Sequence, residues 1–206
     1  MPDDDDEPDD ATDEPATERA FLREQIELAV LGGFADEYDI EDWLEDETTD
    51  EDLLEELKAY AEELFRQERA HEDTWLTPTV NDAIDQAFEE LNERGLVALQ
   101  NAGFTMSDGW TDALEAASEL PDKPRGAVFY HGQDLESGVQ GHGLMLAFGA
   151  FEDDEAKSEA ASAAIAREVC DTLTAHGVEA KWNGSVNSRI EITPFPWRKR
   201  RWTDAP

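Results

Sequence analysis

The residues best suited to chemistry lie in one Gly-rich stretch, residues 131–143, between two apolar runs. The stretch carries two histidines, two carboxylates and an amide: His131, Gln133, Asp134, Glu136 and His142. Two imidazoles and a carboxylate would suit zinc or another divalent ion. A histidine beside a carboxylate would also transfer protons near neutral pH. The spacing matches no established ligand signature, however, and loops collect polar and Gly residues for backbone reasons alone. We expect no bound metal or cofactor.

A second group of polar and aromatic residues follows the predicted strand ends. Asn101, Asp108 and Trp110 come after the first strand, and Trp182 and Asn183 end the fourth. Aromatic and amide side chains at strand ends can line a pocket for a small molecule or a peptide. A tryptophan at a strand end also commonly closes a hydrophobic core. Both interpretations stay open, and the two groups together are the candidate ligand-binding residues.

No sequence motif specifies a reaction. No serine or cysteine has the pattern of a nucleophile elbow, and Cys170 lies beside the apolar stripe of an Ala-rich helix, as a small core residue does. The Gly-containing run 138–143 precedes a strand, so it offers no helix-terminal amides to a phosphate. We therefore predict a non-enzymatic interaction or regulatory module. The alternative is a small metal- or ligand-binding enzyme that uses the 131–143 hairpin loop.

The elements that would position these residues follow from hydrophobic periodicity. Apolar residues recur at helical spacing up to Gly95, and the pattern then changes to strand, helix, strand, strand, helix, strand, strand. Residues 126–130 and 144–148 are expected to form a β-hairpin. The first six elements after Gly95 have the βαββαβ order of a ferredoxin-like sandwich. We predict an α+β fold of this kind with an extra C-terminal strand, two helices on one face of an antiparallel sheet, and a preceding helical segment.

Composition divides the chain into four segments. Residues 1–17 consist almost entirely of Asp, Glu, Pro, Ala and Thr, which predicts a disordered acidic tail. Residues 18–78 are expected to form a helical extension, and residues 79–196 the α+β core domain. Residues 197–206 form a basic and aromatic C-terminal tail. The acidic tail would either keep the protein soluble, attract a basic partner or mimic nucleic acid.

The charge of the chain limits its partners. It holds 52 acidic and 16 basic residues, for a formal net charge of −36. Such a surface repels phosphate backbones and anionic membranes, so nucleic acid and membranes are not expected partners. Two origins of the acidity stay open: a salty cytoplasm, in which dense carboxylates keep a protein hydrated, or a basic partner. We expect a protein partner or self-association.

The C-terminal tail holds the one basic cluster of the sequence. Four consecutive cations at 198–201 lie between Trp197 and Trp202. Basic and aromatic segments can bind single-stranded nucleic acid by charge and stacking. Four charges on a chain of −36 favour instead pairing with the protein's own acidic helices, or with those of a second copy.

The sequence predicts a cytoplasmic protein. Its first residues lack the basic and apolar regions of a signal peptide, and no apolar run approaches the ~20 residues of a membrane span. Cys170 is the one cysteine, so no disulfide framework is expected.

Several motifs resemble those of one bacterial family. They are VFYHGQDLE, LMLAFG, GVEAKWNG with RIEI after it, and the block AIDQAFEELNERGLVALQNAGFTMSDGW. Over roughly residues 20–200 the chain resembles an uncharacterised family known only as a domain of unknown function. The resemblance supports the domain boundaries and implies no activity, cofactor or partner. Some members have a cysteine pair after the first strand, where this chain has residues 104–107, FTMS, so a thiol or metal role there does not transfer.

Overall fold

The computed structural model describes residues 14–201. The chain divides into two compact units, with the boundary in the sequence between Ala70 and His71. The predicted acidic tail lies outside the described residues up to residue 13. Its last residues, from Glu14, are helical.

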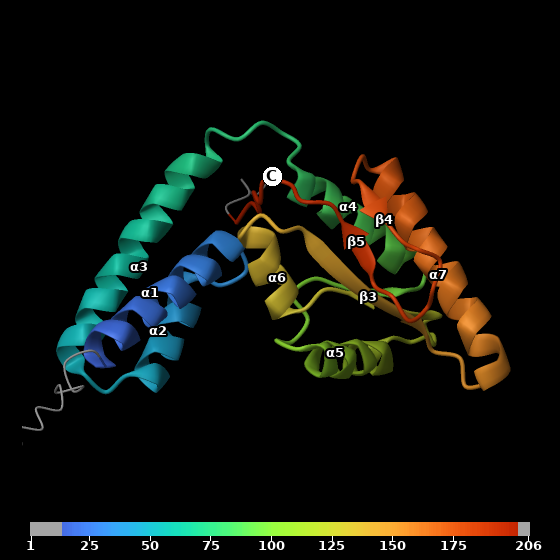
Figure 1. The fold of residues 1–206 in the computed structure, drawn as a ribbon, viewed down its shortest axis with the longest axis horizontal. Helices are drawn as coiled ribbons and strands as arrows, with labels where there is room; N and C mark the ends of the chain where they lie inside the picture. Colours follow the sequence, from blue (N-terminus) through green and yellow to red (C-terminus); the bar gives the residue numbers. More distant parts are fainter. Residues whose placement is uncertain (1–13, 202–206) are drawn as a thin grey trace, which may run out of the picture. The chain divides into compact units, whose positions relative to one another are not determined.

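The first unit is helical. It contains α1 (Glu14–Gly32), α2 (Glu37–Glu47) and most of α3 (Glu51–Glu72) (Figure 1). Each helix buries one apolar stripe, as the spacing of its Leu and Ile residues dictates. The most buried residues are Leu22 and Ile26 of α1, Leu44 of α2 and Leu57 of α3. The opposite faces carry the carboxylates, which stay in water.

The second unit is built on a mixed sheet. Its elements are α4 (Val80–Glu93), β1 (Val97–Leu99), α5 (Met106–Glu119), β2 (Gly126–Phe129), α6 (Gly132–Val139), β3 (Leu144–Ala150), α7 (Glu155–Ala175), β4 (Ala180–Lys181) and β5 (Ile190–Ile192). The sheet order is β1-β2-β3-β5-β4. Strands β1 and β2 are parallel and joined by α5, whereas the other pairs are antiparallel. The chain is thus α+β.

The sheet differs from the predicted ferredoxin-like sandwich. Its first two strands are parallel neighbours, and β2 and β3 are connected by a helix and not by a hairpin loop. The stretch GQDLESGV is helical because Asp134 accepts a hydrogen bond from the backbone N–H of His131, at 3.4 Å, and Leu135 and Val139 are one turn apart. The prediction of a loop here was wrong, because Gly and polar residues occur both in loops and on the exposed face of a short helix.

Helices cover both faces of the sheet, and not the one face that was expected. On one face α4 and α7 pack against alternate strand residues, among them Val128, Leu146 and Ile190. On the other face α5 packs against Val97, Ala127 and Phe129. Figure 1 shows α5 on the side of the sheet opposite α4 and α7. The strand residues therefore alternate between two cores.

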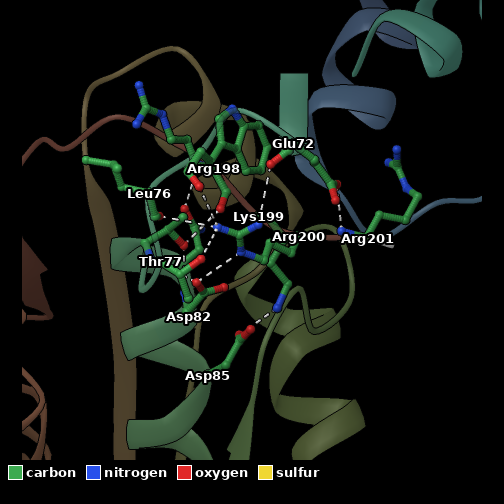
Figure 2. Close-up of polar contacts among 12 residues, drawn as sticks. Glu72, Leu76, Thr77, Asp82, Asp85, Arg198, Lys199, Arg200 and Arg201 are labelled. Atoms are coloured by element: carbon green, nitrogen blue, oxygen red, sulfur yellow. Dashed lines mark hydrogen bonds and ion pairs between the residues drawn. The ribbon is translucent and has the colours of Figure 1, made fainter. Parts of the chain in front are cut away.

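The basic residues of the C-terminal tail lie along the start of α4 and the loop before it (Figure 2). Lys199 Nζ is 2.5 Å from Asp85, and Arg200 Nε is 3.2 Å from Asp82. Arg200 Nη2 also donates to Thr77 Oγ1 at 3.0 Å and to the carbonyl of Leu76 at 3.3 Å. These cations pair with the protein's own acidic residues, as the charge balance predicted. Trp202 lies outside the described residues.

Helix α5 needs a glycine where it approaches the sheet. A Cβ atom on Gly109 would lie 2.3 Å from Cε2 of Phe129. We expect Gly109→Ala to lower the free energy of unfolding by about 1–3 kcal/mol, because the added methyl group overpacks this contact. Urea denaturation measures the change. Glu115→Ala, on the exposed side of α5, is the control and should stay within about 0.5 kcal/mol of the parent.

Arg200 should stabilise the second unit more than its neighbours in the tail do. We expect Arg200→Gln to lower the free energy of unfolding by about 1–3 kcal/mol, because Asp82 and the loop carbonyls lose their donor. The control is Arg198→Gln, whose side chain is exposed and whose hydrogen bonds are made by its backbone. Equal effects of the two substitutions in chemical denaturation would show that the Arg200 contacts contribute nothing.

Candidate functional site

Three titratable or charged side chains meet where β2 ends and β5 begins. His131 follows β2 and caps α6, Asp134 lies in the first turn of α6, and Arg189 directly precedes β5. Nη1 of Arg189 donates to both carboxylate oxygens of Asp134, at 2.9 Å each. Nε2 of His131 lies 3.1 Å from Oδ2 of the same carboxylate. Asp134 therefore ties the end of one strand to the start of another.

The carboxylate at the centre of this cluster is buried. His131 and Asp134 each expose only 5% of their surface. A charge in such a place is costly unless it is paired and hydrogen-bonded. Nε2 of His131 also lies 3.4 Å from Nη1 of Arg189, so this nitrogen contacts both charged groups. Nδ1 of His131 is buried and has no hydrogen-bond partner within the described part of the chain. The imidazole is thus oriented but closed off from solvent.

Arg189 is the exposed member of the cluster. Its side chain keeps 33% of its surface in solvent, against 6% for that of Asp134. Its hydrogen bonds within residues 14–201 all come from Nη1, so Nε and Nη2 have no partner there. The guanidinium is therefore anchored through Nη1, and its side chain lines a groove.

The groove has a volume of about 610 Å³ and lies on the sheet beside β4 and β5. It is lined by Met145, Lys181, Trp182, Asn183, Asn187, Ser188, Arg189 and Glu191. Met145 pairs with Glu191, and Glu191 with Lys181, so these three side chains form one row across the sheet. Ile190 and Ile192 point the other way, into the core under α4 and α7. Because α5 packs on β1 and β2, this row stays uncovered.

Two of the predicted ligand-binding residues, Trp182 and Asn183, line the groove. The indole of Trp182 packs edge-on against Phe148 at 5.6 Å and donates to the carbonyl of Ser185 at 3.0 Å. The side chain of Asn183 accepts from the backbone of Ser185 and donates to Ser188 Oγ. Trp182 therefore contacts the core and lines the groove at once. Asn183 shapes the turn that holds Ser188 beside Arg189.

Three other predicted residues have structural contacts away from the groove. Asn101 has a positive φ of 51° and lines a separate hollow of about 340 Å³ beside α5. Asp108 accepts from the hydroxyl and the backbone N–H of Thr105, and these hydrogen bonds lower the pKa of its carboxyl. Trp110 packs edge-on against Phe129 at 5.1 Å. These contacts account for Asp108 and Trp110 as a helix cap and a core residue.

The residues of the predicted hairpin loop are not brought together. His131 lies at one end of α6 and the exposed His142 beyond the other, and the eight residues of α6 span about 12 Å. Gln133 is exposed and Glu136 half-buried on the helix between them. No group of three His, Cys, Asp or Glu side chains among residues 14–201 has the geometry to hold a metal ion. The predicted hairpin loop over residues 131–143 is wrong, because residues 132–139 form a helix.

Arg189 was not among the residues predicted from the sequence. A usable signal was present, since Arg189 and Glu191 are two apart on β5 and share a face. Its pairing with Asp134, 55 residues away, depends on the sheet order and is not visible in the sequence.

Cys170 has the environment that its helix predicted. It is half-buried and packs against the main core from α7. Burial raises the pKa of its thiol, with a smaller contribution from the charge of Asp171. A thiol that resists ionisation is a poor nucleophile.

The chain is an α+β protein with an open groove beside β4 and β5 of its sheet. The chain matches the family described as Domain of unknown function (DUF6891) over residues 15–201 and belongs to it, which confirms the resemblance. Comparison with curated proteins and with solved structures gave no match. None of the helices in the described residues is long and apolar enough to cross a membrane.

The cluster of His131, Asp134 and Arg189 should contribute to the stability of the protein. We expect Asp134→Asn to lower the free energy of unfolding by about 1–3 kcal/mol, because Arg189 and His131 lose their charged partner. The value lies below the 3–5 kcal/mol typical of a fully buried pair, since Arg189 is one-third exposed. Glu136→Gln on the same helix is the control. Urea denaturation that finds equal losses for both variants would contradict the importance of the cluster.

Proposed function

We propose that the protein is a non-enzymatic interaction module that binds its partner in the groove beside β4 and β5. The observation that carries this proposal is Arg189, which lines the groove, is held at Nη1 by Asp134 and keeps one-third of its side chain exposed. Binding sites typically combine apolar surface with a few well-held polar groups. Trp182 and Met145 supply the first, and Arg189, Asn187 and Ser188 supply the second.

The state of the titratable groups supports binding over catalysis. A general acid or base must reach the proton that it transfers. The His131 ring is buried, and its Nε2 already contacts Asp134 and Arg189. Burial raises the pKa of the Cys170 thiol. Neither group is placed to act on a molecule in the groove.

The charge distribution supports a partner other than nucleic acid. The chain carries a net charge of −36, and Lys199 and Arg200 of its basic cluster are paired with Asp85 and Asp82. Nucleic-acid binding relies on several cations that can replace counterions on the phosphates. Paired cations on an acidic body do not meet this need.

The test is to block the groove without touching Arg189. Asn187 is exposed and lines the groove, so Asn187→Trp would fill it. Gln86 is also exposed and lines a separate hollow with Glu90 and His176, so Gln86→Trp is a matched control. The full-length wild type and both variants are incubated with extract of the source cell, and retained molecules are identified by mass spectrometry at low and high salt.

We expect the wild type and Gln86→Trp to retain the same partner. Retention by Asn187→Trp should fall at least about tenfold, the effect of losing roughly 1.4 kcal/mol of binding free energy. Equal retention by all three proteins, or no retained molecule at either salt concentration, would contradict the proposal.

A further inference from the structure

We propose that the groove is a carboxylate site, in which the Nε–Nη2 edge of Arg189 binds one carboxylate group of the partner in a bidentate manner. This inference rests on the proposed function, because it uses the same groove. It adds the chemical class of the group that is bound there.

The free donors of the Arg189 guanidinium match the geometry of a carboxylate. Arginine offers planar pairs of N–H donors that match the two oxygens of a carboxylate. Nη1 of Arg189 is used by Asp134, at 2.9 Å from each oxygen. Nε and Nη2 form the remaining edge, which has no partner among the described residues and belongs to a side chain that lines the groove.

The side chain of Arg189 is preorganised for binding. Asp134 is fixed by α6, and it also accepts the backbone N–H of His131 at 3.4 Å. Because Asp134 and His131 are both buried, they hold Nη1 of Arg189 in place before any partner binds. A side chain that is already ordered loses little conformational entropy on binding. Asp134 and His131 are therefore positioning residues.

The charges around the groove favour a carboxylate over a phosphate. Lys181 is 3.1 Å from Glu179, and Glu191 lies beside Lys181 in the row across the sheet. Asp134 already balances the charge of Arg189. The groove thus offers donor geometry without an excess of positive charge, which suits a planar monoanion and disfavours a dianion.

The remaining lining groups suit the body of an organic acid. Trp182 and Met145 give apolar surface, and Ser188 gives a hydroxyl. A free carboxylic acid and the end of a peptide share this chemistry. Two probes separate these sources: N-acetylalanine, and the tripeptide acetyl-Ala-Ala-Ala with a free C-terminus. Each is compared with its own carboxamide, which keeps the shape and removes the charge.

The experiment is an NMR titration of the ¹⁵N-labelled full chain, followed at the Nε–H signal of Arg189 and the indole N–H of Trp182. We expect both signals to shift in a saturable way with the carboxylates, with a dissociation constant on the order of 1 mM or below. The carboxamides and inorganic phosphate should bind at least about tenfold more weakly. Tighter binding of the tripeptide than of N-acetylalanine assigns a peptide partner, and the reverse assigns a free acid.

Arg189→Lys keeps the charge that Asp134 needs and removes the planar edge, and it should weaken carboxylate binding at least about tenfold. Lys123→Gln changes an exposed cation outside the groove and should leave binding unchanged. Equal binding of acid and amide by the wild type would overturn the inference, as would tighter binding of phosphate. The two proposals can fail separately. If Asn187→Trp loses the partner and Gln86→Trp retains it, but the wild type does not bind the carboxylates in these titrations, the proposed function stands and the carboxylate assignment alone is refuted.

Discussion

The second unit depends on how one buried carboxylate is neutralised. Asp134 lies in the first turn of α6, where little water reaches it, so its charge must be met by protein donors. Arg189 and His131 meet it from the start of β5 and the end of β2. The same contact fixes the angle of the Arg189 guanidinium. A requirement of folding thereby produces an ordered cation at the edge of an otherwise acidic protein.

The placement of this cation follows from how the sheet is covered. Helices α4 and α7 bury one face along β1 to β5, and α5 buries the other face over β1, β2 and the Ala147 end of β3. The side chains of Met145, Glu191 and Lys181 lie beyond α5 on that face and line the groove. Trp182 packs on Phe148 of β3 and also lines the groove. The open region is therefore a consequence of sheet order, and Arg189 stands at its margin.

Local signals made part of this architecture predictable. Apolar spacing predicted the helices from Glu18 onward and the strands around Val97, Val128 and Leu146, because each period is read within a few residues. The segment between β2 and β3 was misread, since Gly132, Gly138 and its polar residues also fit a loop. Strand order, and with it the meeting of Asp134 and Arg189, depends on long-range pairing that a single sequence does not reveal. Trp182 and Asn183 were found because aromatic and amide residues at a strand end are a local signal.

We propose that Asp134 holds Arg189 at Nη1, which leaves the Nε–Nη2 edge to bind a carboxylate. A crystal structure of the full chain with N-acetylalanine tests it most directly. We predict the carboxylate oxygens at about 2.7–2.9 Å from Nε and Nη2 of Arg189, with Nη1 still bonded to Asp134. A carboxylate bound elsewhere on the protein, or an Arg189 that has left Asp134 to reach it, would contradict the account.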